Sequence, residues 1–260
     1  MASARALSRS SILVCLVLII AGQILSSSLV EQFFYLSIVN NQLLVILGIP
    51  LLFAWRGQVN WHELFPFSSP PLKFWSWTLV LAICADTLLE YLVWLSEKLL
   101  PLPETVAMRF DELLSINSFE DFLLKVFFLC LLPAFAEEIC FRGFFQGALS
   151  KHYGKLIALG ITALIFAFLH GNTWYFHLYL LLGVWFGGLR ILSASLLPSI
   201  FCHFINNSWT LGLNAAQLAA PFFPAQPALD IALFVGAFAG GLFALRKLWL
   251  FSKDFPRIKL

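Results

Sequence analysis

The chain has 260 residues, of which 60% are hydrophobic and 12% are charged. Soluble globular domains carry roughly 25% charged residues, so this composition excludes a soluble globular protein. We predict an all-α, polytopic integral membrane protein. The formal net charge of +2 indicates little by itself. We expect membrane lipids among the partners and no nucleic acid.

Apolar segments follow one another along the chain and predict about eight transmembrane helices. These segments are 11–30, 33–55, 73–95, 119–149, 156–170, 174–189, 191–213 and 229–245. A cleavable signal peptide is the alternative for the first segment. Prolines mark the loop 56–72 and the uncharged stretch 214–228, and Pro198 lies inside the seventh segment. The acidic stretch 101–117 is predicted to be an outward-facing connection.

Basic residues gather on one side of the membrane if the N-terminus lies inside. With eight crossings, the basic N-terminus, the basic loop 151–155 and the basic C-terminal tail then share that side. We therefore predict a multi-pass protein with cytoplasmic N- and C-termini, and the short loops favour a bacterial inner membrane. No internal repeat or soluble domain is visible, so 1–260 is interpreted as a single membrane domain.

Two adjacent carboxylates, Glu137 and Glu138, interrupt the apolar segment 119–149, and Arg142 follows closely. Charge within hydrocarbon is expensive, so an ionisable residue in a membrane segment indicates a functional site. Glu138 and Arg142 are four residues apart with the acid first, which is the spacing of a helical ion pair. We therefore predict that Arg142 neutralises Glu138, which leaves Glu137 available for chemistry.

Two further apolar segments carry polar side chains at a similar depth. His170 lies late in the fifth segment, and His203 and Asn207 share one face of the seventh. Counted from the cytoplasmic ends of their helices, Glu137, His170 and His203 each lie about 18–21 Å from the inner edge. Three helices thus bring polar groups to one plane, and we expect these groups to converge in one cavity.

The types of these side chains favour hydrolysis. A carboxylate in an apolar environment is a better base near neutrality than one in water. Glu137 is therefore a candidate to activate a water molecule that it shares with His170. The N–H groups of His203 and Asn207 suit the oxyanion of a tetrahedral intermediate. This set predicts hydrolysis of an acyl compound, most simply a peptide bond.

Three short motifs occur in chain order: Glu-Glu-x-x-x-Arg at 137–142, Phe-x-x-x-His at 166–170 and His-x-x-x-Asn at 203–207. Together they resemble the motifs of the CAAX-protease and bacteriocin-processing (CPBP, or Abi) family of intramembrane endopeptidases. The resemblance covers about 119–213, which we interpret as the catalytic core.

The resemblance implies a membrane fold of about eight helices around a conical intramembrane cavity, and proteolysis of a membrane-associated protein or peptide. It also implies that Glu137 with His170 activates water. His203 with Asn207 is implied to stabilise the oxyanion, in a glutamate-type mechanism that needs no metal cofactor.

Alternatives stay open. Two histidines and one glutamate are suitable ligands for a catalytic Zn²⁺ with one open position, so a zinc-dependent version of the same protease is one alternative. No His-Glu-x-x-His sequence is present. A proton or solute carrier is a second alternative, which the missing repeat symmetry disfavours. A non-catalytic membrane immunity protein is a third.

Further residues are candidates for lining the cavity. Asp86 and Glu90 are four residues apart in the third segment, at the depth of the histidines, and we expect them to line the wall or to hold water. Phe166 and Cys140 adjoin the motifs and are further candidates. The other cysteines are interpreted as small buried hydrophobes, because no spacing typical of a metal or redox site is present.

Overall fold

The computed structural model describes residues 6–27, 33–218 and 220–253. Within these residues the fold is all-helical and contains no strand, as predicted. Residues 28–30 of the first predicted segment lie outside the described residues, and so do Arg257 and Lys259 of the predicted basic C-terminal tail.

The helical elements are short in places but join into longer runs. Their order is α1 (Arg9–Ser27), α2 (Phe34–Val39), η1 (Asn40–Gly48), α3 (Ile49–Arg56), α4 (Trp61–Leu64), α5 (Leu72–Leu99), α6 (Glu104–Leu114), α7 (Phe119–Lys125), η2 (Val126–Leu131), α8 (Leu132–Glu138), η3 (Ile139–Phe145), α9 (Gln146–Tyr153), α10 (Lys155–Leu169), α11 (Phe176–Ser193), α12 (Leu197–Ala215) and α13 (Pro227–Ser252). The η elements are π-helical stretches, which widen the backbone hydrogen-bond pattern by one residue. α2, η1 and α3 form one continuous run, and α7, η2, α8, η3 and α9 form another.

Helices largely fill the predicted membrane segments where these are described. In the part of the chain that the structure describes, five helices are long and apolar enough to cross a membrane: Arg9–Ser27, Phe34–Arg56, Leu72–Leu99, Phe176–Ser193 and Pro227–Ser252. α10 is apolar as well but shorter, with 15 residues. The chain is thus an integral membrane protein, and the count of eight crossings stays a prediction.

Two boundaries differ from the prediction. The acidic connection 101–117 contains the helix α6, and the apolar side chains of α6 at helical spacing, such as Phe110, face a cavity. Pro198 lies in the first turn of α12 rather than inside a helix. A proline is favoured at this position because the first N–H groups of a helix have no partner within it.

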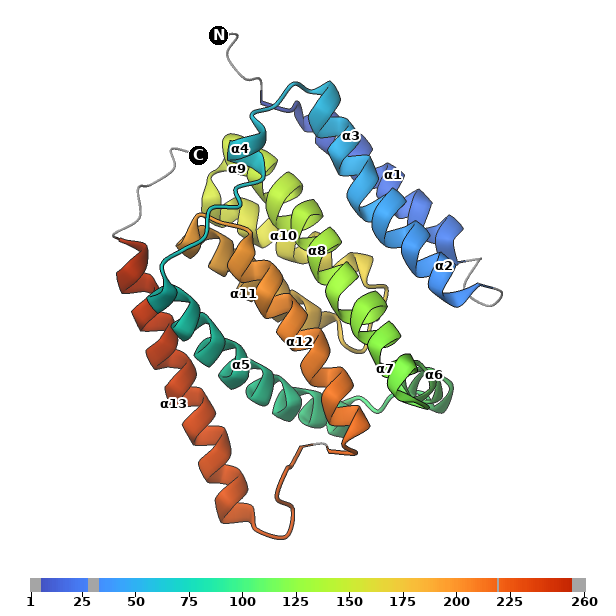
Figure 1. The fold of residues 1–260 in the computed structure, drawn as a ribbon, viewed down its shortest axis with the longest axis vertical. Coiled ribbons are helices and arrows are strands. Elements are labelled where there is room, and N and C mark those ends of the chain that lie inside the picture. Colours follow the sequence, from blue (N-terminus) through green and yellow to red (C-terminus); the bar gives the residue numbers. More distant parts are fainter. Residues whose placement is uncertain (1–5, 28–32, 219, 254–260) are drawn as a thin grey trace.

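α12 lies in the middle of the bundle (Figure 1). It packs against α5 on one side and against η2 and α8 on the other, and it also contacts α11. α5 pairs along its length with α13, and α10 pairs with α11. α13 lies at one edge of the molecule, and α1 lies with the α2–η1–α3 run at the other. At this second edge η1 contacts α8, and α3 contacts η3.

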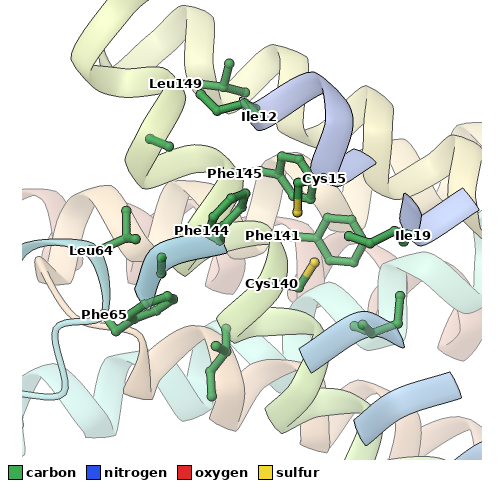
Figure 2. Packing of buried hydrophobic residues seen from close by; sticks show 14 of the residues in the cluster. Ile12, Cys15, Ile19, Leu64, Phe65, Cys140, Phe141, Phe144, Phe145 and Leu149 are labelled. Atoms are coloured by element: carbon green, nitrogen blue, oxygen red, sulfur yellow. The ribbon is translucent and has the colours of Figure 1, made fainter. Parts of the chain in front are cut away.

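The largest buried cluster joins this edge to η3 (Figure 2). Phe141, Phe144 and Phe145 lie in it with Cys15 of α1. Cys140 is fully buried in the same cluster. The prediction that Cys140 lines the cavity is therefore wrong. The wider turn of the π-helical stretch rotates this side chain off the cavity face and toward α1.

Two glycines allow α10 and α11 to approach closely. A Cβ atom on Gly183 would lie 2.8 Å from Cα of Ala163, and one on Gly187 would lie 2.3 Å from Cδ1 of Leu159. Small residues four positions apart are typical of such close helix pairs in membranes. The close packing holds α10, which leads into His170, against α11.

Candidate active site

A cavity of about 570 Å³ lies at one end of the bundle. The C-terminal half of α5, α6, η2, α8, the start of α11 and the C-terminal half of α12 enclose it. The structure places Glu137, His170, His203 and Asn207 on its wall. Residues that are far apart in the sequence thus meet at one cavity, and their catalytic roles stay a prediction.

The predicted ion pair between Glu138 and Arg142 is present and buried. Nη1 of Arg142 donates to Oε1 of Glu138 at 2.7 Å, with side-chain exposures of 1% and 0%. Nδ1 of His203 donates to the same oxygen at 2.9 Å, and Nη2 of Arg142 donates to the Gly183 carbonyl at 3.3 Å. Charge-assisted hydrogen bonds of this kind offset the cost of burying both charges.

Phe166 lies against this ion pair and not on the cavity wall. The guanidinium carbon of Arg142 is 4.3 Å from the centre of the Phe166 ring, which is 1% exposed. A cation over an aromatic face is attracted by the ring. The prediction that Phe166 lines the cavity is therefore wrong: its ring covers Arg142 because both face the interior between η3 and α10.

Glu137, the neighbour of Glu138, faces the cavity instead. Its side chain is 12% exposed. Oε1 accepts a hydrogen bond of 2.9 Å from Nε2 of Gln42 in η1. Oε2 has no hydrogen-bond partner among the described residues, and it lies 3.9 Å from Nε2 of both His170 and His203. One carboxylate oxygen is thus held in place and the other points between two imidazoles.

His170 lies at the end of α10 with its ring held on two sides. Nδ1 donates to the Phe166 carbonyl at 2.7 Å, and the ring stacks on Tyr179 at 4.0 Å between centroids. Because a carbonyl only accepts hydrogen bonds, Nδ1 carries the proton in the neutral ring. Nε2 then has a free lone pair, and this atom faces Glu137.

The ring of His203 is oriented in a similar way by a carboxylate. Its Nδ1 bonds to Glu138, and its ring stacks on Phe186 with 4.8 Å between centroids. Its Nε2 faces Glu137. The ring donates from Nε2 only when both nitrogens carry protons, and Glu138 already faces the ring to balance that charge.

Asn207 lies one helical turn beyond His203 on α12. Its Nδ2 donates to the Leu129 carbonyl over 3.4 Å, a long hydrogen bond. Pro133, four residues after Leu129, has no N–H and does not satisfy that carbonyl in the α-helical pattern. The proline in α8 thus leaves an acceptor that holds Asn207 at the cavity, with a second amide hydrogen still available.

The two acids of α5 differ in position. Glu90 lines the cavity, as predicted. Asp86 is 1% exposed and does not line the cavity, which corrects the prediction for this residue. Its Oδ1 accepts a hydrogen bond of 2.8 Å from Nδ2 of Asn206, which does line it. Asp86 lies one helical turn before Glu90. At the level of Asp86, α5 packs against α12, so the Asp86 side chain faces that helix instead of the cavity.

The charged side chains of the cavity wall are acidic. Glu90, Glu97, Asp111 and Glu137 line it, and the described lining residues include no lysine or arginine. The Tyr175 hydroxyl donates to Glu97. The summed field of such a wall favours uncharged or positively charged groups and disfavours anions.

Sequence reasoning missed three residues that orient the site: Gln42, Tyr179 and Asn206. Gln42 lies in the second predicted segment, but its partner Glu137 lies 95 positions away, so spacing along a single helix does not connect them. Tyr179 faces His170 from the neighbouring helix. Asn206 directly precedes Asn207. The signal that could have identified it is that it is a third polar residue, after His203 and Asn207, in the same apolar segment.

The described residues contain no group of three or more His, Cys, Asp or Glu side chains arranged to hold a metal ion. The donor types of Glu137, His170 and His203 suit zinc. The zinc alternative therefore has suitable residue types but no preformed ligand set in this part of the chain.

Residues 119–209 match the family model described as type II CAAX prenyl endopeptidase Rce1-like. The matched segment contains Glu137, His170, His203 and Asn207. Comparisons with curated proteins and with solved structures give no match. The matched family agrees with the one that the three motifs resemble. The chain thus carries a CAAX-protease-like peptidase segment within an integral membrane protein.

Proposed function

We propose that the chain is an intramembrane endopeptidase that hydrolyses a peptide bond of a membrane-associated protein or peptide. The position of Glu137 Oε2 carries this proposal, because it lies on the cavity wall 3.9 Å from two imidazole nitrogens. This distance is too long for a direct hydrogen bond and suits a water molecule bound between the groups. The family match supports the same class of reaction.

Glu137 acts as the general base in this proposal. It takes a proton from water as the water oxygen attacks the carbonyl carbon of the scissile bond. Nε2 of His170, which has a free lone pair, accepts a hydrogen bond from the second hydrogen of that water, which stays on the attacking oxygen. When the C–N bond breaks, Glu137 returns the proton to the leaving amine, so that protons and electron pairs balance. The hydrogen bond from Gln42 keeps the carboxylate oriented throughout.

His203 and Asn207 stabilise the oxyanion. Both lie on the cavity wall, on the same face of α12. Donors aimed at the developing negative charge are commonly worth about 10²–10³ in rate for each hydrogen bond. Glu138 and Arg142 act one layer behind, since they hold the His203 ring in place without reaching the cavity centre.

The cavity favours a particular kind of substrate segment. The description of the matched family, a CAAX prenyl endopeptidase, supports a substrate that a lipid anchors to the membrane. The acidic wall favours a segment that is uncharged or basic next to the scissile bond. A segment that presents a free carboxylate to Glu90 is disfavoured.

The position of the cavity also constrains access. It lies at the end of the bundle near α6, away from the turn between α9 and α10 (Figure 1). With the basic loop 151–155 in the cytoplasm, as the positive-inside rule predicts, the cavity occupies the outer half of the membrane. This placement suits substrates that reach the protein after export.

The test is cleavage of tagged, lipid-anchored peptides by the purified chain in liposomes, with acidic, neutral or basic residues beside the scissile bond. We expect cleavage that prefers neutral and basic peptides and survives the chelator phenanthroline. Loss of cleavage on chelation with recovery on added zinc contradicts the metal-free mechanism. Failure of the folded chain to cleave any peptide, together with proton flux in the same liposomes, favours the carrier.

A further inference from the structure

Arg190, near the C-terminal end of α11, is a buried cation outside the proposed active site. The residue is 3% exposed, and its Nε atom is buried without a hydrogen-bond partner. Among the described residues, no hydrogen bond or ion pair to Arg190 is present. Arg142, the other buried arginine of this region, has Glu138 as its partner. A buried charge without a counter-charge is unfavourable, so an anion bound next to Arg190 would stabilise the folded chain.

A small pocket lies around Arg190. Arg142 and Lys155 line it together with Ser150, and none of the described residues on its wall is acidic. The buried Nε of Arg142 also lacks a hydrogen-bond partner. The pocket has a volume of about 10 Å³, which is roughly enough for one water molecule or one oxygen atom of an anion. It therefore accommodates one oxygen of an anion whose remaining atoms lie at the mouth, near Lys155.

The pocket lies at the level expected for lipid headgroups. Arg190 is in the last turn of α11, and Lys155 begins α10, at the opposite end of the bundle from the cavity (Figure 1). Leu156 and Ile157, which follow Lys155, are 76% and 58% exposed. An acyl chain can lie along these apolar side chains while the headgroup faces the cations. Basic pockets between membrane helices typically bind anionic headgroups in this way.

We propose that this pocket, defined by Arg190, Lys155 and Ser150, binds the phosphate of an anionic phospholipid. The bound lipid supplies the counter-charge of Arg190 and ties the end of α11 to the start of α10. Because His170 directly follows the last residue of α10, the lipid stabilises the helix pair that carries part of the proposed active site. The lipid site does not depend on the proposed peptidase activity.

Thermal unfolding of the full chain tests this proposal, in maltoside micelles that contain either phosphatidylglycerol or phosphatidylcholine. A thiol-reactive dye reports unfolding, since Cys15, Cys130, Cys140 and Cys202 are buried and unpaired. The variants are Arg190→Gln and Lys155→Gln. Arg56→Gln is the matched control, because Arg56 is an exposed cation in the last turn of α3. A further arm adds inorganic phosphate to micelles that contain phosphatidylcholine.

We expect phosphatidylglycerol to raise the midpoint of the wild type and of Arg56→Gln by about 4 °C over phosphatidylcholine. This increase in melting midpoint falls below about 1 °C in Arg190→Gln, and in Lys155→Gln it falls to about half of the wild-type increase. In phosphatidylcholine, Arg190→Gln melts at or above the wild type, because an unpaired buried charge has been removed. This reversal between the two lipids is not produced by a variant that simply folds poorly.

Three results contradict the proposal. The first is an equal phosphatidylglycerol increment in the wild type and in Arg190→Gln. The second is an Arg190→Gln midpoint that is lower by the same amount in both lipids, which makes Arg190 a purely structural residue. The third is an increment from inorganic phosphate that equals the one from phosphatidylglycerol, which identifies free phosphate as the ligand. If Arg190→Gln does not fold, a full increment in Lys155→Gln contradicts the proposal.

Discussion

Glu137 and Glu138 are adjacent on one helix, yet their surroundings are opposite. Glu138 is fully buried, and one of its oxygens accepts hydrogen bonds from both Arg142 and His203. Glu137 is 12% exposed on the cavity wall, where an amide holds one oxygen and the other faces two imidazoles at 3.9 Å. Successive residues of a helix point about 100° apart, so one side chain faces the interior and the next faces the cavity.

In the proposed mechanism, this difference keeps one carboxylate inert and the next one reactive. The Glu138 charge is balanced within the protein, so its role is to orient His203. The Glu137 charge has no arginine or lysine beside it in the described part of the cavity wall, so it remains available as a base. The variants below are expected to affect these two carboxylates differently.

Glu137→Gln is expected to have the largest effect on cleavage, a loss of about 10³-fold, because the amide does not take a proton from water. The melting midpoint should stay within about 3 °C, since the new side chain keeps its shape and still accepts from Gln42. Initial cleavage rates and melting curves check this. Glu120→Gln, an exposed change in α7, is the control. Retained cleavage in Glu137→Gln excludes the residue as the base.

Arg142→Met should destabilise the fold strongly, because it leaves the buried Glu138 without a cation. Breaking a buried pair costs about 3–5 kcal/mol, which corresponds to a fall in melting midpoint of about 10 °C. The double variant Glu138→Gln with Arg142→Met should recover most of this loss. Equal midpoints for the single and double variants mean that the charge balance is not what stabilises this region.

His170→Gln should lower the cleavage rate by about 10²-fold, because the flexible amide does not hold an acceptor at the position where Nε2 of the fixed imidazole faces the water. The loss should appear in the turnover rate more than in substrate affinity. His177→Gln is a matched control, since His177 bonds to Ser96 and does not line the cavity. If both variants lose the same activity, the role of His170 is structural.

Asp86→Ala should lower cleavage about tenfold without preventing folding, because it removes the oxygen that accepts from Asn206. Asp86 acts by positioning Asn206, the neighbour of Asn207, through a 2.8 Å hydrogen bond. A small displacement at a catalytic group is enough for a loss of this size. Turnover equal to that of the wild type in a normally folded variant contradicts this positioning role.

Local spacing predicted part of the site. The interval of four residues between Glu138 and Arg142 predicted their ion pair, because one turn of helix brings these side chains together. Matched depth on three helices predicted a shared cavity for Glu137, His170 and His203, and the structure places all three on one wall. These features depend on residue counting along single helices.

Other features depend on how helices are rotated and packed, which spacing does not encode. The π-helical stretch η3 turned Cys140 toward α1, and Phe166 covers Arg142 rather than the cavity. Gln42 reaches Glu137 from a separate helical run. The helix α6 was interpreted as a loop because its acidic residues masked the apolar face that closes the cavity.

The most direct test of the central claim compares the two carboxylates in one assay. Glu137→Gln and the double variant Glu138→Gln with Arg142→Met are reconstituted in the same liposomes, and single-turnover cleavage and melting are measured for each. We predict that Glu137→Gln melts like the wild type and loses about 10³-fold in rate. The double variant should lose less than about 10²-fold, because the amide oxygen that replaces the Glu138 carboxylate still accepts from His203 and only the counter-charge of the protonated ring is lost. Equal loss of rate in both variants contradicts the division between a reactive and an inert carboxylate.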